Sequence, residues 1–175
     1  KTVEEIIIEK VASIGEKISL RRVKTITGQH ISFYIHNSVS VNFGKIGVAV
    51  SLSSENDTLA KQIAMHIAAS NPIALNKDKL SPDLLKSEEK LYYDQAKDSG
   101  KPDNILQNVV KGKLEKFINE VTLLNQKFVI DPDKTVNEVL IENNVKILDY
   151  VRFEVGEGIE KTSEDFADEV MKTIS

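Results

Sequence analysis

The three histidines are the residues best suited to bind a metal ion or to exchange a proton near neutral pH. His30 and His36 lie six residues apart in an alternating, β-rich stretch. On one strand they would be roughly 20 Å apart, which is too far to share one ion. His66 lies in the run AMHIAAS, beside an apolar helical stripe, where a histidine more often packs than coordinates. This spacing predicts no metal site and places His66 in the scaffold.

Other catalytic patterns are missing as well. Glu154, Glu157 and Glu160 could imitate a pair of catalytic carboxylates, but no apolar or basic residues are arranged to separate their pKa values, so we interpret them as a solvated face. The run GEGIEK at 156–161 lacks the glycine spacing of a phosphate-binding loop, and neither GxSxG nor HExxH occurs. We therefore expect no catalytic residue, no metal and no cofactor, and the sequence favours a binding protein over an enzyme.

The composition is that of an ordinary globular protein. Of the 175 residues, 41% are hydrophobic and 29% are charged, and the net charge at pH 7 is -4. Positive and negative residues are interspersed, which gives neither the basic footprint of a nucleic-acid-binding protein nor a polybasic membrane patch. There is no cysteine, and no apolar run reaches the roughly 18 residues of a membrane span. We expect a cytoplasmic protein that contacts neither nucleic acid nor membrane.

The first third of the chain predicts a helix followed by strands. Thr2 and Glu5 have the spacing of a capping box, apolar residues then recur at helical intervals, and Gly15 suits the helix C-terminus. Residues 18–49 are mostly alternating and β-rich, which predicts three short antiparallel strands. Asp57 follows as the N-cap expected for a second helix.

The middle of the chain predicts a helical hairpin. Residues 81–120 carry apolar side chains at three- and four-residue steps, interrupted by the turn sequence SGKP at 99–102. Two such helices cannot bury both of their faces against each other alone. We therefore expect a projecting coiled-coil arm that packs along a single seam.

The last part predicts strands and helices again. The run NEVTLLNQKFVI at 119–130 has the pattern of a strand leading into a loop, and Thr135 begins another capping box. Residues 145–155 alternate as a strand, and Ser163 caps a last helix.

The order of strands followed by a helix therefore occurs twice. It predicts an α+β fold of two small subdomains, with antiparallel sheets and packed helices. Residues 1–80 form the first subdomain, the arm of residues 81–120 is inserted in the second, and residues 121–175 complete the second with the C-terminal helix.

Eight stretches of the chain form a set with a fixed order and spacing: IGEKISLRR (14–22), YIH (34–36), AMHIAASNP (64–72), GKP (100–102), KFINEVTLLNQKFV (116–129), PDKTV (132–136), VRFEVGEGIEK (151–161) and DFADEV (165–170). In this order and spacing they resemble bacterial elongation factor Ts over almost the entire chain. The resemblance implies a guanine nucleotide exchange factor that binds elongation factor Tu and promotes GDP release, built on two α+β subdomains with an inserted hairpin. It also implies possible self-association and a scaffold role for the helix that carries His66.

The resemblance places partner contacts at five positions. Ile14, Gly15 and His36 correspond to contacts with the GTP-binding domain of elongation factor Tu, and Val129 and Ile130 to contacts with another of its domains. Each has a plainer interpretation. Gly15 and Ile14 could simply end a helix, and His36 could be an ordinary surface histidine. For the last pair, we expect the preceding phenylalanine in the core and the pair itself at the start of an exposed loop.

The sequence departs from the family pattern in three places. The family's Thr-Asp-Phe-Val motif, whose Asp-Phe pair acts as a wedge beside the partner's magnesium site, would lie before Lys1. The run after His36 is longer and lacks the usual early glycine, while Lys127 replaces proline and Ile130 replaces methionine. We therefore expect a dimerisation core with binding surfaces but reduced exchange activity. The alternative is a structural or dimerising module without exchange activity of its own.

Overall fold

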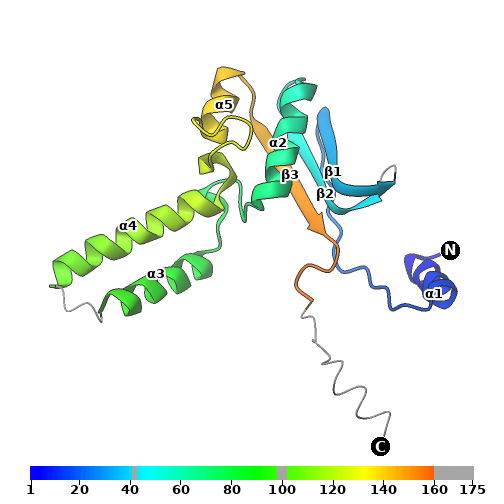
Figure 1. Ribbon diagram of the computed structural model, residues 1–175, viewed down its shortest axis with the longest axis horizontal. Coiled ribbons are helices and arrows are strands. Elements are labelled where there is room, and N and C mark those ends of the chain that lie inside the picture. The colour runs from blue at the N-terminus through cyan, green and yellow to red at the C-terminus, as the bar shows by residue number, and fades with distance from the viewer. Residues whose placement is uncertain (41–42, 98–101, 160–175) are drawn as a thin grey trace, which may run out of the picture.

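The computed structural model describes residues 1–40, 43–97 and 102–159. Within them lie five α-helices and one three-stranded antiparallel sheet, which confirms the α+β class (Figure 1). The last helix that the sequence predicts, from Ser163, lies outside the described residues. Of the helices in the described residues, none has the length and apolar character that a bilayer span requires.

The sheet is built from two adjacent strands and one distant strand. β1 (His30–Ser40) and β2 (Phe43–Leu52) form a hairpin, and β3 (Ile147–Glu154) pairs with the other edge of β2, giving the order β1-β2-β3. The sheet therefore takes strands from both of the ranges predicted as subdomains. The division into two subdomains stays a prediction, and the described residues contain a single sheet.

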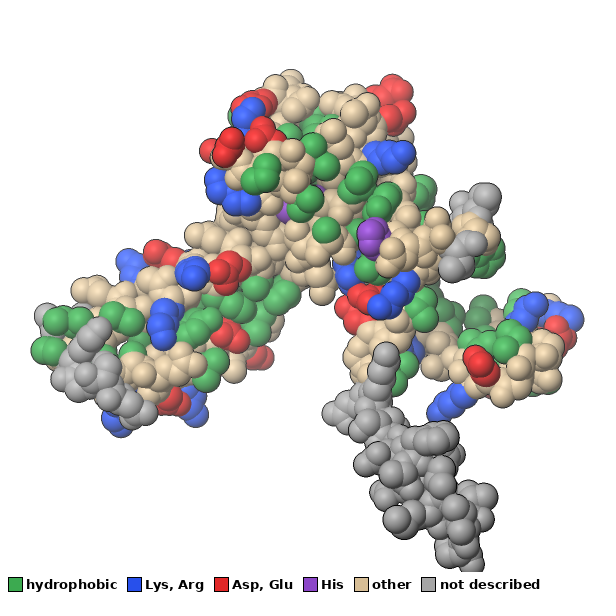
Figure 2. Space-filling model, viewed as in Figure 1, with side chains coloured by type: hydrophobic (Ala, Val, Ile, Leu, Met, Phe, Trp, Pro, Cys, Tyr) green, Lys and Arg blue, Asp and Glu red, His purple; other side chains and the backbone are tan. Residues whose placement is uncertain are grey.

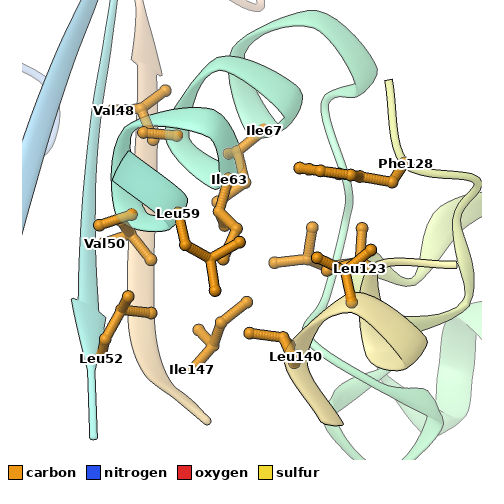
Figure 3. Close-up of a cluster of buried hydrophobic side chains, with 14 of the residues drawn as sticks. Val48, Val50, Leu52, Leu59, Ile63, Ile67, Leu123, Phe128, Leu140 and Ile147 are labelled. Atoms are coloured by element: carbon orange, nitrogen blue, oxygen red, sulfur yellow. The ribbon is translucent and has the colours of Figure 1, made fainter. Parts of the chain in front are cut away.

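The core has three layers. The sheet forms the first layer, α2 (Asp57–Ser70) the second, and η2 (Leu123–Asn125) with α5 (Val136–Glu142) the third. Figure 3 shows α2 between side chains of β2 on one side and those of the third layer on the other. Each fully buried aliphatic or aromatic side chain here contributes about 1.5–3 kcal/mol to stability. The core side chains labelled in Figure 3 are Val48, Val50, Leu52, Leu59, Ile63, Ile67, Leu123, Phe128, Leu140 and Ile147.

Local capping signals set the ends of α2 and α5. The α2 N-cap is Asn56, one residue before the predicted Asp57, because the Asn56 side chain accepts a hydrogen bond from the Leu59 N–H at 3.1 Å. Asn71 ends α2 with a left-handed φ of 44°. At α5, Thr135 and Glu138 form the predicted capping box.

The predicted arm is confirmed. α3 (Pro82–Lys97) and α4 (Asp103–Val121) run side by side and project from the rest of the molecule (Figure 1). The strand predicted within 119–130 is wrong, because α4 continues to Val121 and η2 follows. Thr122 holds this junction, since its hydroxyl donates to the Ile118 carbonyl at 2.7 Å.

The N-terminal region differs from the prediction in one element. α1 (Val3–Ile14) begins at the expected capping box and ends at Gly15, whose φ is 81°, but none of its side chains is buried. The first of the three strands predicted within 18–49 is absent. Residues 16–29, which we call the N-terminal segment, contain no strand, because they contact β3 through side chains rather than through a backbone ladder.

Candidate partner-docking surface

The predicted contact pair Val129–Ile130 lies on a tightly closed loop. Phe128 is 2% exposed, whereas Val129 is 50% and Ile130 47% exposed, as predicted. We call residues 126–131 the docking loop. The Phe128 N–H donates to the Lys134 carbonyl at 2.9 Å, so the chain reverses within a few residues. Consequently two branched aliphatic side chains point to solvent from a backbone that is fixed beneath them.

His66 anchors this loop from α2. Its ring is 0% exposed, and its Nδ1 accepts a hydrogen bond from the Val129 N–H at 3.2 Å. On the other side of the ring, Nε2 lies 3.0 Å from the Gln126 Oε1. Burial lowers the pKa of His66, and the Gln126 hydrogen bond opposes this effect in part. The prediction that His66 belongs to the scaffold is confirmed, and its burial is complete.

Ile14 and Gly15 lie where α1 ends. Ile14 is 57% exposed, and Gly15 takes the left-handed conformation that ends a helix, with its N–H bonded to the Val11 carbonyl. A Cβ added at Gly15 would meet no atom within 4 Å. The plainer interpretation of Gly15 as a helix end is therefore confirmed. The open space around the pair leaves room for a partner contact.

His36 is exposed on β1. It stands opposite Ile46 of β2, so it lies on the face of the sheet that also carries the core-facing side chains. Its Nδ1 is 3.0 Å from the Tyr34 hydroxyl. This contact between neighbouring residues of one face orients the imidazole while the ring remains accessible.

The five predicted residues occupy three separate places: the end of α1, β1 and the docking loop. Four clefts on the described part of the chain are lined by other residues. Exposed hydrophobic side chains occur in separate groups on the visible face rather than as one patch (Figure 2). Dispersed, convex contact points suit a large partner with several touching regions better than they suit a small molecule.

The acidic residues of β3 and the turn after it are engaged in ion pairs. Glu154 accepts hydrogen bonds from Arg152 and then from Lys45, and these hold its pKa below the ordinary value. Glu157 pairs with Arg22, and Glu160 lies outside the described residues. In the part of the chain that the structure describes, no group of three His, Asp or Glu side chains could hold a metal ion.

Sequence reasoning missed two features near these places. The first is Gln126, which is 9% exposed and connects the docking loop to α4 and α2. The sequence signal for this contact is a glutamine within the apolar run LLNQKF, because a buried amide needs hydrogen-bond partners. The other feature is the contact between the N-terminal segment and β3. Lys24 bonds Asp149 and the Tyr150 carbonyl, and Arg22 lies 5.1 Å above the Phe153 ring.

The comparison with known families decides the identity. The family model described as elongation factor TS matches residues 1–157. The chain belongs to the elongation factor Ts family. This confirms the resemblance found in the sequence and places the chain among translation elongation factors.

Individual members of the elongation factor Ts family align with the whole chain. The protein named elongation factor Ts from Dinoroseobacter shibae is 46% identical over 175 residues, which are 100% of this chain and 60% of that relative. Its namesake from Roseobacter denitrificans is 44% identical, over 99% of this chain and 60% of its own length. The Paracoccus denitrificans protein is also 44% identical, with the same two shares. The chain thus spans about 60% of the length of these curated relatives.

Proposed function

We propose that this chain binds elongation factor Tu and promotes release of its bound GDP. Family membership supports the partner. The observation that carries the proposal is the docking loop, where a half-exposed aliphatic pair, Val129 and Ile130, stands on a backbone fixed by a buried histidine. Exposed apolar side chains on a rigid support are typical of the few residues that dominate an interface.

Exchange of this kind requires no bond chemistry. A protein that binds the nucleotide-free partner more tightly than the GDP-bound partner must weaken GDP binding by the same factor, because the two equilibria are linked. The chain therefore has to supply differential contacts, not catalytic groups. Ion-paired carboxylates and a buried neutral histidine are compatible with that role.

The separate positions of the contact residues fit a partner with more than one domain. We assign Ile14, Gly15 and His36 to the GTP-binding domain of elongation factor Tu and the docking loop to a further domain. Contacts on two domains at once would let binding energy from one contact favour a changed arrangement at the other.

We expect this chain to accelerate GDP release less than a family member that carries the Thr-Asp-Phe-Val motif. The Thr-Asp-Phe-Val motif that the family uses as a wedge does not occur in the 175 residues. The binding surfaces would then hold the partner, while the largest differential contact is absent. We therefore propose tight docking with weak acceleration of GDP release.

The test is stopped-flow release of fluorescent GDP from elongation factor Tu, titrated with this chain, beside calorimetric binding to the nucleotide-free partner. We expect measurable binding and a modest rise in the release rate. Strong acceleration would show that the wedge is dispensable, whereas absence of binding would overturn the proposal.

A matched pair of variants tests the docking loop. Ile130→Ser should weaken binding about tenfold, because an apolar contact in the interface core is lost. Ile141→Ser is the control: this isoleucine lies on α5 and is 69% exposed, yet no contact is assigned to it. Equal effects of both substitutions would show that the loop is not the docking surface.

The alternative function, a dimerising module, is favoured by one observation. Phe33 of β1 stands opposite Ala49, on the sheet face away from α2, and is 71% exposed. Sedimentation analysis from micromolar to millimolar concentrations tests self-association directly. A dimer that fails to bind elongation factor Tu would favour this alternative, and a monomer that binds it would exclude the alternative.

A further inference from the structure

The buried histidine connects three segments that are distant in sequence. His66 lies on α2, Gln126 follows η2, and Val129 is the exposed residue directly after the buried Phe128. A chain of hydrogen bonds runs through the ring. The Val129 N–H donates to Nδ1 at 3.2 Å, Nε2 is 3.0 Å from the Gln126 Oε1, and the Gln126 Nε2 donates to the Glu120 carbonyl at 2.8 Å.

This chain of bonds defines the tautomer of the ring. A backbone N–H can only donate, so Nδ1 of His66 must carry a lone pair, and the proton of the neutral ring therefore lies on Nε2. Nε2–H then donates to Gln126 Oε1. The orientation of the Gln126 amide is fixed in turn, because its NH₂ group faces the Glu120 carbonyl. Each polar atom in the chain thus has a partner of the opposite kind.

We propose that His66 is a positioning residue for partner docking: its neutral Nε2–H tautomer holds the Val129 backbone and so fixes the direction in which Val129 and Ile130 leave the core. The inference rests on the proposed function, since it concerns the loop assigned there to elongation factor Tu. It goes further by naming the group that orders this loop. Pre-ordering reduces the entropy lost on binding, so the bound complex should last longer.

Packing supports this role for His66. The ring lies 5.8 Å from the Phe128 ring, centroid to centroid, so the same loop is held by an apolar contact beside the hydrogen bond. Phe128 fixes the depth of the loop in the core. The Val129 N–H bond fixes the rotation of the next peptide, and this rotation sets where the Val129 side chain points.

Protonation would break this arrangement. A second proton on Nδ1 would face the Val129 N–H, which places two donors against each other. Among the described residues, the influences on the His66 pKa are burial, which lowers it, and the hydrogen bond with Gln126, which raises it. Gln126 and Val129, both in the docking loop, present a side-chain amide and a backbone N–H to the ring. The ring therefore stays neutral and holds the loop at neutral pH.

Two substitutions separate the two ring nitrogens. In His66→Asn, the side-chain oxygen takes the position of Nδ1 and can still accept from the Val129 N–H. In His66→Gln, the amide reaches the position of Nε2 and keeps the link to Gln126 but leaves the Val129 N–H without its acceptor. Both variants place an amide in the same buried site, so each serves as the control for the other.

The first readout is independent of any partner. Nitrogen NMR of the imidazole in the unmodified chain should show the Nε2–H tautomer, and the Val129 amide should exchange with deuterium slowly in the unmodified chain and in His66→Asn. We expect exchange at least about tenfold faster in His66→Gln, because the N–H bond is lost. An Nδ1–H tautomer, or equal protection of Val129 in both variants, would overturn the inference.

The second readout is the dissociation rate from nucleotide-free elongation factor Tu. We expect dissociation about tenfold faster for His66→Gln, with His66→Asn close to the unmodified chain. If His66 only stabilised the fold, the dissociation rates of the two variants would instead follow their stabilities. That result would contradict the proposed positioning role. If the unmodified chain does not bind at all, the proposed function fails, while the Val129 exchange comparison still decides whether His66 holds the loop.

Discussion

The docking loop and the chain from α1 through the N-terminal segment are held to the rest of the molecule in opposite ways. Beneath the docking loop lie Phe128 and His66, which are 2% and 0% exposed. The N-terminal segment and the α1 helix before it contain no buried side chain, and the N-terminal segment contacts β3 through charged side chains such as Lys24, which pairs with Asp149. One surface is ordered by the core, and the other is attached by exposed ion pairs.

The difference shows how one fold can carry both a rigid surface and a weakly held surface. Buried contacts of the docking loop are insensitive to salt, whereas exposed ion pairs contribute little and are screened. We therefore expect Val129 and Ile130 to bind with little loss of entropy. The end of α1, which carries Ile14 and Gly15, should lose more freedom of movement when the partner binds.

The largest expected effect is on stability, through the core beneath the docking loop. Leu123→Ala removes a 0% exposed side chain of the third layer and should lower the free energy of unfolding by about 2–5 kcal/mol. Ile8→Ala, on α1 at 60% exposure, should change it by less than about 0.5 kcal/mol. Urea denaturation measures both. Similar losses for the two variants would show that α1 packs in a core as firmly as η2 does.

The next largest effect is expected on the affinity for the partner. The double variant Val129→Ala with Ile130→Ala should weaken binding to elongation factor Tu by about 1–3 kcal/mol without changing stability, because both residues are about half exposed. Ile14→Ala should cost less, since part of its contact energy offsets the ordering of α1. Calorimetry gives both affinities, and a larger loss for Ile14→Ala would reverse the assigned ranking.

The pH dependence of stability should come from His66, which is buried beneath the docking loop. In the folded chain the pKa of His66 lies below 6.5, the ordinary value that we expect in the unfolded chain. At pH values between these two pKa values, the unfolded chain binds more protons than the folded chain. Stability should be constant above about pH 6.5 and fall as the pH decreases below it. Glu138, whose pKa is lowered first by the Thr135 backbone, affects only more acidic conditions. Denaturation curves of His66→Gln should lack the first decline; if they retain it, another group causes it.

Salt should produce the smallest effect, and only on the N-terminal segment. Near 1 M salt the Debye length is about 3 Å, which screens the ion pairs of Arg22 and Lys24. Proteolytic cleavage after these residues should become about twofold to fivefold faster relative to cleavage after Lys127 of the docking loop. Mass spectrometry of the fragments gives the ratio. A ratio independent of salt would mean that other contacts hold the segment.

Local signals were predicted well because they depend on neighbours in sequence. The capping boxes of Thr2 and Thr135, the left-handed Gly15 and the arm all follow from spacings of three or four residues. The docking pair was predicted as exposed because Phe128 precedes it as an apolar anchor. Its assignment to elongation factor Tu came from the family resemblance and remains a proposal.

The errors arose where a pattern needs a distant partner. Residues 18–27 alternate like a strand, but a strand requires a backbone hydrogen-bond ladder with a neighbour, and in the described residues this segment contacts β3 through side chains instead. Residues 119–130 were predicted as a strand leading into a loop, yet α4 continues to Val121 and a 3₁₀ turn follows Thr122.

The sequence alone indicates the capping boxes of α1 and α5, the arm, the family and the absence of a recognisable catalytic motif, because these depend on residue types at short spacing or on a string of motifs in order. It also placed His66 at the edge of an apolar stripe. Only the tertiary structure decided that this edge is fully buried, because η2 and Phe128 cover the side of α2 away from the sheet. The hydrogen bond of His66 with Gln126 and the one that it accepts from the Val129 N–H join residues about sixty positions apart, and no local pattern encodes such a contact.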